Sequence, residues 1–260
     1  MYIVEGGNVF KDADKNSLTR NINRLEVAPT VRFLEQITGL SLMDNMLGTT
    51  GQKETSGDID LAVDSSIISK DALINVLMKY CEAHNFPKPA IKKSGNNVHL
   101  LTPIEGDPAK GYVQTDFMFF TNMDYSKWAY GAMPQSSQFK GVDRAVLLNS
   151  IGKAVRQIPG MKTPAGVKVD VNSGMKDRLT DELLTANPNE IAQALLNPQA
   201  NAQDLASVES IIGELRNDPQ RDAKLADFAK YLETSGRKMP QLEASAHPTE
   251  WLRHWSNKLK

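Results

Sequence analysis

The chain has 260 residues, of which 40% are hydrophobic and 23% charged, and its formal net charge is −1. This balance argues against a protein that coats nucleic acid through a broad basic surface, but it leaves open local binding of a nucleotide or an RNA end. The sequence contains no run of about 18 apolar residues, so we expect no membrane partner. A single cysteine and a start, Met1–Gly6, without the basic and long apolar parts of a signal peptide predict a cytoplasmic protein.

In the first part of the chain, apolar spacing predicts a helix in which Pro29 lies in the first turn and Gly39 forms the C-cap. A loop over residues 48–57 follows, and then Asp58–Asp64 alternates strictly between polar and apolar residues, as a half-buried strand does. Ser69 is the expected cap of the next helix. The core face of that helix is expected to carry Leu73, Ile74, Leu77, Met78 and Cys81.

Two further strands are predicted over Val98–Leu101 and Tyr112–Phe120, with a Gly- and Pro-rich connection typical of a long hairpin. A helix is then expected over Val142–Ile158, and Pro159–Gly160 ends it. A short strand-like segment, Val167–Val171, precedes a rear part whose apolar spacing is helical.

These elements predict an α+β fold in which a mixed sheet is flanked by helices. We expect residues 1–160 to form this core and residues 161–260 to form a mainly helical region.

Three aspartates carry the candidate chemistry. Asp58 and Asp60 are two positions apart on a predicted strand, so both carboxylates project from the same face. Asp116 lies within an aromatic strand, where an unpaired charge is costly to bury. If the two strands are neighbours, the three carboxylates meet, and their mutual repulsion is relieved by a hard divalent cation such as Mg²⁺ or Mn²⁺.

The loop before the first of these strands has the composition of a phosphate-binding segment. Gly48 allows close approach of the backbone, and the Thr49 hydroxyl can donate to a phosphate oxygen. Lys53 can add a positive charge. The sequence therefore predicts that a triphosphate lies between this loop and the aspartates.

Gly48-Thr49, followed by Glu54-Thr55-Ser56-Gly57-Asp58-Ile59-Asp60-Leu61, resembles the signature of the DNA polymerase β-like nucleotidyltransferase superfamily. The resemblance covers about residues 47–120. It implies two bound metal ions held by Asp58, Asp60 and Asp116, nucleoside-triphosphate binding by Gly48 and Thr49, and transfer of a nucleotidyl group. The threonine of the glycine pair departs from the usual serine or glycine, and Lys53 is the one basic residue where family X polymerases usually carry arginines.

Ser137 and Lys140 stand at the entry to the helix after the third aspartate, where members of the superfamily often contact the nucleotide. A helix cap with an exposed lysine explains them equally well. The tail Trp251–Lys260 is amphipathic and basic, and is expected either to dock on the helical part or to contact RNA.

The leading hypothesis is a metal-dependent transferase that moves a nucleoside monophosphate from a nucleoside triphosphate, such as ATP, to an acceptor hydroxyl. An RNA or tRNA end is one candidate acceptor, and a protein side chain, a small molecule or a DNA primer are others. The alternatives are a catalytically inactive module with the same fold and a glycosyltransferase with an Asp-x-Asp motif. The sequence predicts neither the base preference nor the oligomeric state.

Overall fold

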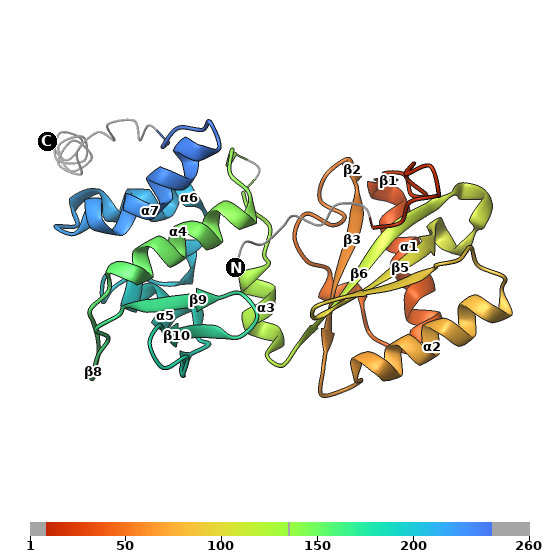
Figure 1. Cartoon of the computed structure of the whole chain (residues 1–260), viewed down its shortest axis with the longest axis horizontal. Helices are drawn as coiled ribbons and strands as arrows, with labels where there is room; N and C mark the ends of the chain where they lie inside the picture. The colour runs from red at the N-terminus through yellow and green to blue at the C-terminus, as the bar shows by residue number, and fades with distance from the viewer. Residues whose placement is uncertain (1–8, 135, 241–260) are drawn as a thin grey trace, which may run out of the picture.

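The computed structural model describes residues 9–134 and 136–240 (Figure 1). The basic tail from Trp251 to Lys260 lies outside the described residues. Within those residues, no helix combines the length and apolar character needed to cross a membrane.

A four-stranded sheet forms the centre of the first part of the chain. Its strands are β3 (Asp58–Asp64), β4 (Ile91–Ser94), β5 (Asn97–Pro103) and β6 (Tyr112–Phe120), in the order β3-β6-β5-β4. β3 runs parallel to β6, whereas β5 pairs antiparallel with both β6 and β4. The sheet is therefore mixed, as the sequence predicts, although β4 was not expected.

Two helices, α1 (Arg24–Thr38) and α2 (Lys70–Ala83), pack on one face of this sheet. Every second residue of the strands points into their shared core, which is why the alternating strand pattern was readable in the sequence. The core residues from β3, β5 and β6 are Ile59, Leu61, Val63, Val98, Leu100, Val113, Phe117 and Phe119. The other face of the sheet carries the polar residues Asp58, Asp60 and Asp116, together with apolar residues such as Ala62, Leu101 and Phe120 that belong to two smaller clusters.

The ends of these helices follow local chemistry. Gly39 ends α1 with φ +72° and donates its N–H to the Glu35 carbonyl, and Ser69 caps α2 by accepting the Ala72 N–H. The expectation that Pro29 lies in the first turn was wrong, because α1 begins at Arg24, where the Glu26 carboxylate accepts the Asn23 N–H.

Only part of the predicted core face of α2 is buried. Leu73, Ile74 and Leu77 lie in the core, whereas Cys81 is half-buried and Met78 is exposed over 46% of its surface. Two short strands, β1 (Ile22–Asn23) and β2 (Thr55–Ser56), pair and tie the start of α1 to the approach to β3.

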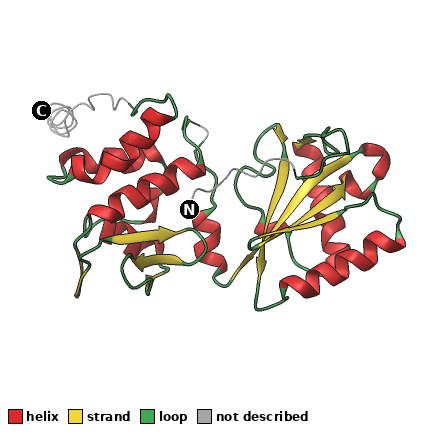
Figure 2. Cartoon of the chain, in the orientation of Figure 1, coloured by secondary structure: helices red, strands yellow, loops and turns green. Residues whose placement is uncertain are grey.

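The rest of the chain forms a second packing unit that contains both helices and strands (Figure 2). Its largest sheet has three antiparallel strands. Its helices are α3 (Met123–Ala129), α4 (Gly141–Ala154), α5 (Pro188–Leu195), α6 (Val208–Glu214) and α7 (Arg221–Thr234). Its sheet consists of β9 (Val167–Asp170), β10 (Gly174–Asp177) and β11 (Leu183–Thr185). Thus the rear part contains strands as well as the helices that were expected.

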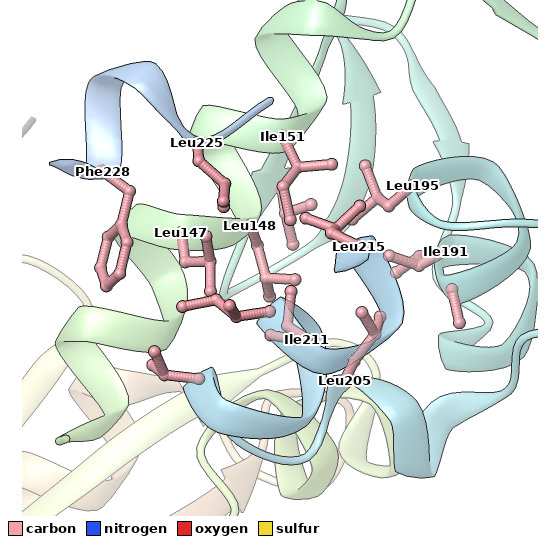
Figure 3. Packing of buried hydrophobic residues seen from close by; sticks show 14 of the residues in the cluster. Leu147, Leu148, Ile151, Ile191, Leu195, Leu205, Ile211, Leu215, Leu225 and Phe228 are labelled. Atoms are coloured by element: carbon pink, nitrogen blue, oxygen red, sulfur yellow. The ribbon is translucent and has the colours of Figure 1, made fainter. Parts of the chain in front are cut away.

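The hydrophobic core of this second unit is built around α4 (Figure 3). Leu147, Leu148 and Ile151 of α4 pack with Leu195 of α5 and Phe228 of α7. Tyr125 of α3 belongs to the same core. The change from one core to the next therefore falls between β6 and α3, not near residue 160, because α4 is buried against the rear helices.

The predicted helix over Val142–Ile158 is also shorter than expected. α4 ends at Ala154, and Gln157–Ile158 forms strand β7, which pairs with β8 (Met161–Lys162). Pro159 and Gly160 make the turn of this hairpin, with Gly160 at φ +77°. Proline and glycine thus turn a strand here and do not end a helix.

Candidate active site

The three aspartates meet on the sheet face opposite α1 and α2. Asp58 and Asp60 project from β3 on this face, and the parallel register places Asp60 directly beside Asp116 of β6. One oxygen from each of the three carboxylates lies within 4.8 Å of the other two. The expected convergence is confirmed, and it depends on the pairing of two strands that are about 50 residues apart in the sequence.

The electrostatics of this cluster are unfavourable without a cation. Burial, with the neighbouring Asp58 and Asp116 charges, raises the pKa of Asp60 to about 8. Burial and the Asp116 charge also raise the pKa of Asp58. Within the described residues, no lysine or arginine forms an ion pair with any of the three.

The donor set fits a hard divalent cation. Three carboxylates supply only oxygen ligands, the kind that Mg²⁺ and Mn²⁺ prefer, and a cation removes the repulsion that raises the two pKa values. The ligand set predicted from the sequence is thus chemically suitable. That a metal binds stays a prediction.

Asp64 shows that position on the strand does not by itself make a ligand. It lies on β3 four residues after Asp60, but its carboxylate accepts the N–H (2.8 Å) and the hydroxyl (2.6 Å) of Ser66. These hydrogen bonds hold the pKa of Asp64 below its usual value. Asp64 therefore fixes the turn that follows β3 and stands apart from the cluster.

The loop before β3 is hydrogen-bonded to the backbone of Asp60. Thr50 accepts the Asp60 N–H through its hydroxyl at 3.1 Å, and the Leu47 N–H donates to the Asp60 carbonyl at 2.9 Å. Gly48 adopts φ +56°, and a Cβ at this position would lie 3.7 Å from Asp60 Oδ2. The left-handed backbone favours glycine here, whereas the distance to the carboxylate is an ordinary van der Waals contact that would admit a Cβ.

The predicted phosphate ligands Thr49 and Gly48 differ in the hydrogen bonds that their donors make. In the part of the chain that the structure describes, neither the Thr49 hydroxyl nor its backbone N–H has a hydrogen-bond partner. The Gly48 N–H, in contrast, is used by the Tyr130 carbonyl at 2.9 Å. Lys53 is exposed on the same loop. The backbone donor available for a ligand thus comes from Thr49 and not from Gly48.

The two residues predicted beyond Asp116 have other contacts. The Ser137 hydroxyl lies 2.9 Å from a carboxylate oxygen of Glu209 in α6, so it ties its loop to the rear unit. Lys140 is the N-cap residue of α4, and its backbone N–H donates to Asp143 at 2.8 Å. The structure brings neither residue into the carboxylate cluster, and nucleotide contact by either stays a prediction.

Tyr130 joins the site to the second unit. Its carbonyl accepts the Gly48 N–H, its ring lies 5.3 Å from the Phe120 ring, and its hydroxyl donates to Asn172 Oδ1 at 3.0 Å. Burial raises the pKa of Tyr130 to about 12, with Asp170 and Asp60 adding to the shift. The loop before β3 is thereby linked to the turn between β9 and β10.

Two functional candidates escaped the sequence reading. His99 of β5 and Gln114 of β6 both hydrogen-bond the Asp116 carboxylate, at 2.7 and 3.0 Å. By itself, a lone histidine on a strand gives no signal of such a role. The hairpin between β5 and β6 was predictable, but its register was not, and the register alone places His99 opposite Asp116.

No protein-family model matches the chain, and no curated protein matches it at a significant level.

Proposed function

We propose that the protein is a metal-dependent nucleotidyltransferase that transfers a nucleoside monophosphate from a nucleoside triphosphate to an acceptor hydroxyl. The observation that carries the proposal is the meeting of Asp58, Asp60 and Asp116 within 4.8 Å, beside a glycine loop. A group of neighbouring acids in which burial and like charges raise the pKa values of Asp58 and Asp60 is typical of a functional site.

In this proposal each residue has a distinct task. Asp58, Asp60 and Asp116 would hold the metal ions, and Asp116 would thereby help to make the acceptor hydroxyl more acidic. Two bound Mg²⁺ or Mn²⁺ ions would supply Lewis-acid chemistry that neutralises the triphosphate and makes the acceptor hydroxyl more acidic. Thr49 binds phosphate oxygens through its hydroxyl and N–H.

The overall reaction forms one P–O bond and breaks another. The acceptor oxygen bonds to the α-phosphorus, the bond from that phosphorus to the leaving oxygen breaks, and pyrophosphate departs. The hydroxyl proton is lost to solvent. The protein contributes chiefly positioning and charge complementarity, because the reacting groups are supplied by the two substrates.

An RNA or tRNA end is one candidate acceptor, and a protein side chain, a small molecule and a DNA primer are the others. The third carboxylate favours this reaction over that of an Asp-x-Asp glycosyltransferase, which needs no acid on a neighbouring strand. The alternative, a catalytically inactive module with the same fold, predicts no metal-dependent change in thermal stability.

The direct test is incubation of the purified chain with each labelled nucleoside triphosphate, Mg²⁺, and either total RNA or a protein extract. We expect label to be transferred to one acceptor class, and to be lost with Asp58→Asn. Asp64→Asn is the matched control, because it changes an aspartate on the same strand that is bound to Ser66 and lies outside the cluster. Absence of transfer, together with no Mn²⁺- or Mg²⁺-dependent rise in melting temperature, would support the inactive module.

A further inference from the structure

A polar row crosses the sheet at the level of the candidate site. The strand registers place Asp60 beside Asp116, and Asp116 opposite His99 of β5. The His99 side chain is only 7% exposed, and its Nδ1 lies 2.7 Å from Asp116 Oδ1. A buried histidine that contacts a candidate metal ligand is thus built into the sheet next to the carboxylates.

The hydrogen bonds to Asp116 are concentrated on one of its two oxygens. Oδ1 accepts both from His99 Nδ1 and from Gln114 Nε2, the latter at 3.0 Å. Oδ1 acts as the acceptor in both contacts when the imidazole hydrogen lies on Nδ1, which is the tautomer that this arrangement favours. The lone pairs of Oδ1 are then largely occupied, and Oδ2 is the oxygen left for another ligand.

The second donor is itself held in place. Gln114 is 2% exposed, and its Oε1 accepts the Val9 N–H at 2.9 Å. The carbonyl of the same Val9 accepts a hydrogen bond from Lys92 of β4, the residue opposite His99. The Gln114 amide orientation is therefore fixed from both ends, and so is the hydrogen that it directs at Asp116.

We propose that His99, supported by Gln114, is a positioning residue that fixes the Asp116 carboxylate so that Oδ2 faces the metal. This inference rests on the proposed function, since it takes Asp116 to be a metal ligand. Carboxylate ligands in metal sites are commonly oriented by hydrogen bonds to their other oxygen, and loss of such a partner weakens metal binding about 10- to 100-fold.

A purely structural hydrogen bond between the same two strands provides the comparison. On the opposite face of the sheet, the Thr102 hydroxyl of β5 donates to the Thr115 hydroxyl of β6 at 2.8 Å, and both residues are fully buried. This pair connects β5 to β6 as the His99–Asp116 pair does, but it faces α1 and α2. Removing it therefore tests whether loosening the hairpin alone disturbs the site.

The experiment measures Mn²⁺ binding to the purified full chain by electron paramagnetic resonance, with the melting temperature of each variant recorded alongside. Three variants are compared: His99→Leu, His99→Asn and Thr102→Val. Leucine and asparagine have nearly the same shape, but asparagine keeps an N–H donor near the position of Nδ1. We expect His99→Leu to weaken Mn²⁺ binding about 10- to 100-fold, His99→Asn to restore most of it, and Thr102→Val to leave it unchanged.

The outcomes separate the two proposals. If the wild-type chain binds no Mn²⁺, the proposed function fails. If the wild type binds Mn²⁺ and His99→Leu binds it equally well, or if Thr102→Val weakens binding as much as His99→Leu, the positioning role is overturned while the proposed function stands. Should His99→Leu not fold, Gln114→Met carries the same test, since weaker Mn²⁺ binding supports the inference and unchanged binding overturns it.

Discussion

Two sites in this molecule place aspartates in opposite electrostatic surroundings: Asp143 lies among hydrogen-bond donors, whereas Asp60 lies among other carboxylates. Asp143 of α4 has a fully buried side chain that accepts four hydrogen bonds, from both terminal nitrogens of Arg237, from the Tyr231 hydroxyl and from the Lys140 N–H. Asp60 shares its site with two other carboxylates and with no lysine or arginine among the described residues.

The pKa directions record the difference. Burial by itself raises the pKa of Asp143, but the hydrogen bonds from Arg237, Lys140 and Tyr231 lower it below its usual value. Burial and two like charges raise the pKa of Asp60 instead. The comparison indicates that Asp143 stabilises the fold by joining α4 to the end of α7, whereas the carboxylate cluster lowers the stability of the metal-free chain.

The largest expected effect is on activity and comes from Asp60→Asn. This change keeps the shape of the side chain but removes a metal-binding charge, so nucleotidyl transfer should fall at least about 1000-fold, or about 4 kcal/mol of transition-state stabilisation. The measurement is label transfer under saturating Mg²⁺. If the variant keeps activity within tenfold of wild type, the carboxylate cluster is not needed for catalysis, and the proposed difference in role between Asp60 and Asp143 is wrong.

The same conservative change in the other group should act on stability. Asp143→Asn leaves the Arg237 guanidinium without its charged partner and should lower the free energy of unfolding by about 3 kcal/mol. Urea unfolding measures this loss, and the variant should keep its activity at low temperature. The control is Asp227→Asn, whose ion pair with Lys153 is about half exposed and contributes at most about 1 kcal/mol.

The dependence of stability on pH should differ in sign between the two groups. Because the pKa of Asp60 is higher in the folded state, this group makes the metal-free chain less stable as pH rises from about 4, its unfolded pKa, to about 8. Asp143 has the reverse shift, so its contribution is present above about pH 4 and is lost as pH falls through its lowered pKa.

Asp60→Asn tests this sign directly. The change should raise the melting temperature of the metal-free protein at pH 8.5, by about 2 to 4 °C for each kcal/mol gained. At pH 5 the rise should be much smaller, because the folded wild type already carries the proton. Thermal unfolding in a chelator at both pH values measures the effect, and a lower melting temperature of the variant at pH 8.5 contradicts it.

The smallest expected effect concerns the loop beside the cluster. Thr49→Val removes a hydroxyl that has no partner among the described residues, so folding should be little changed. The KM for the nucleoside triphosphate should rise about fivefold to tenfold, which corresponds to roughly 1 kcal/mol of a lost hydrogen bond. Thr49→Ser, which keeps the hydroxyl, should bind as the wild type does. Equal KM values for the two variants would show that the Thr49 hydroxyl does not bind the triphosphate.

Much of the site was predictable because its signals are local. The alternation in Asp58–Asp64 placed two carboxylates on one face and Ile59, Leu61 and Val63 on the other, and the structure has both arrangements. Positive φ at Gly48 and the cap at Ser69 likewise depend on a few neighbouring residues. The sequence by itself therefore determined the strands that carry the carboxylates, the helices that cover their reverse face and the loop beside them.

Only the tertiary structure decided which strands lie side by side and in which register. The pairing of Asp60 with Asp116, the contact from His99, and the burial of Asp143 against Arg237 each join residues that lie far apart in the chain or whose alignment no local pattern specifies. Packing over the whole chain also decides that α4 belongs to the core of the second unit and that Met78 is exposed, both of which differ from the sequence prediction. The reason is physical: side-chain periodicity selects the face of an element, but burial over the whole chain selects the partner of that face.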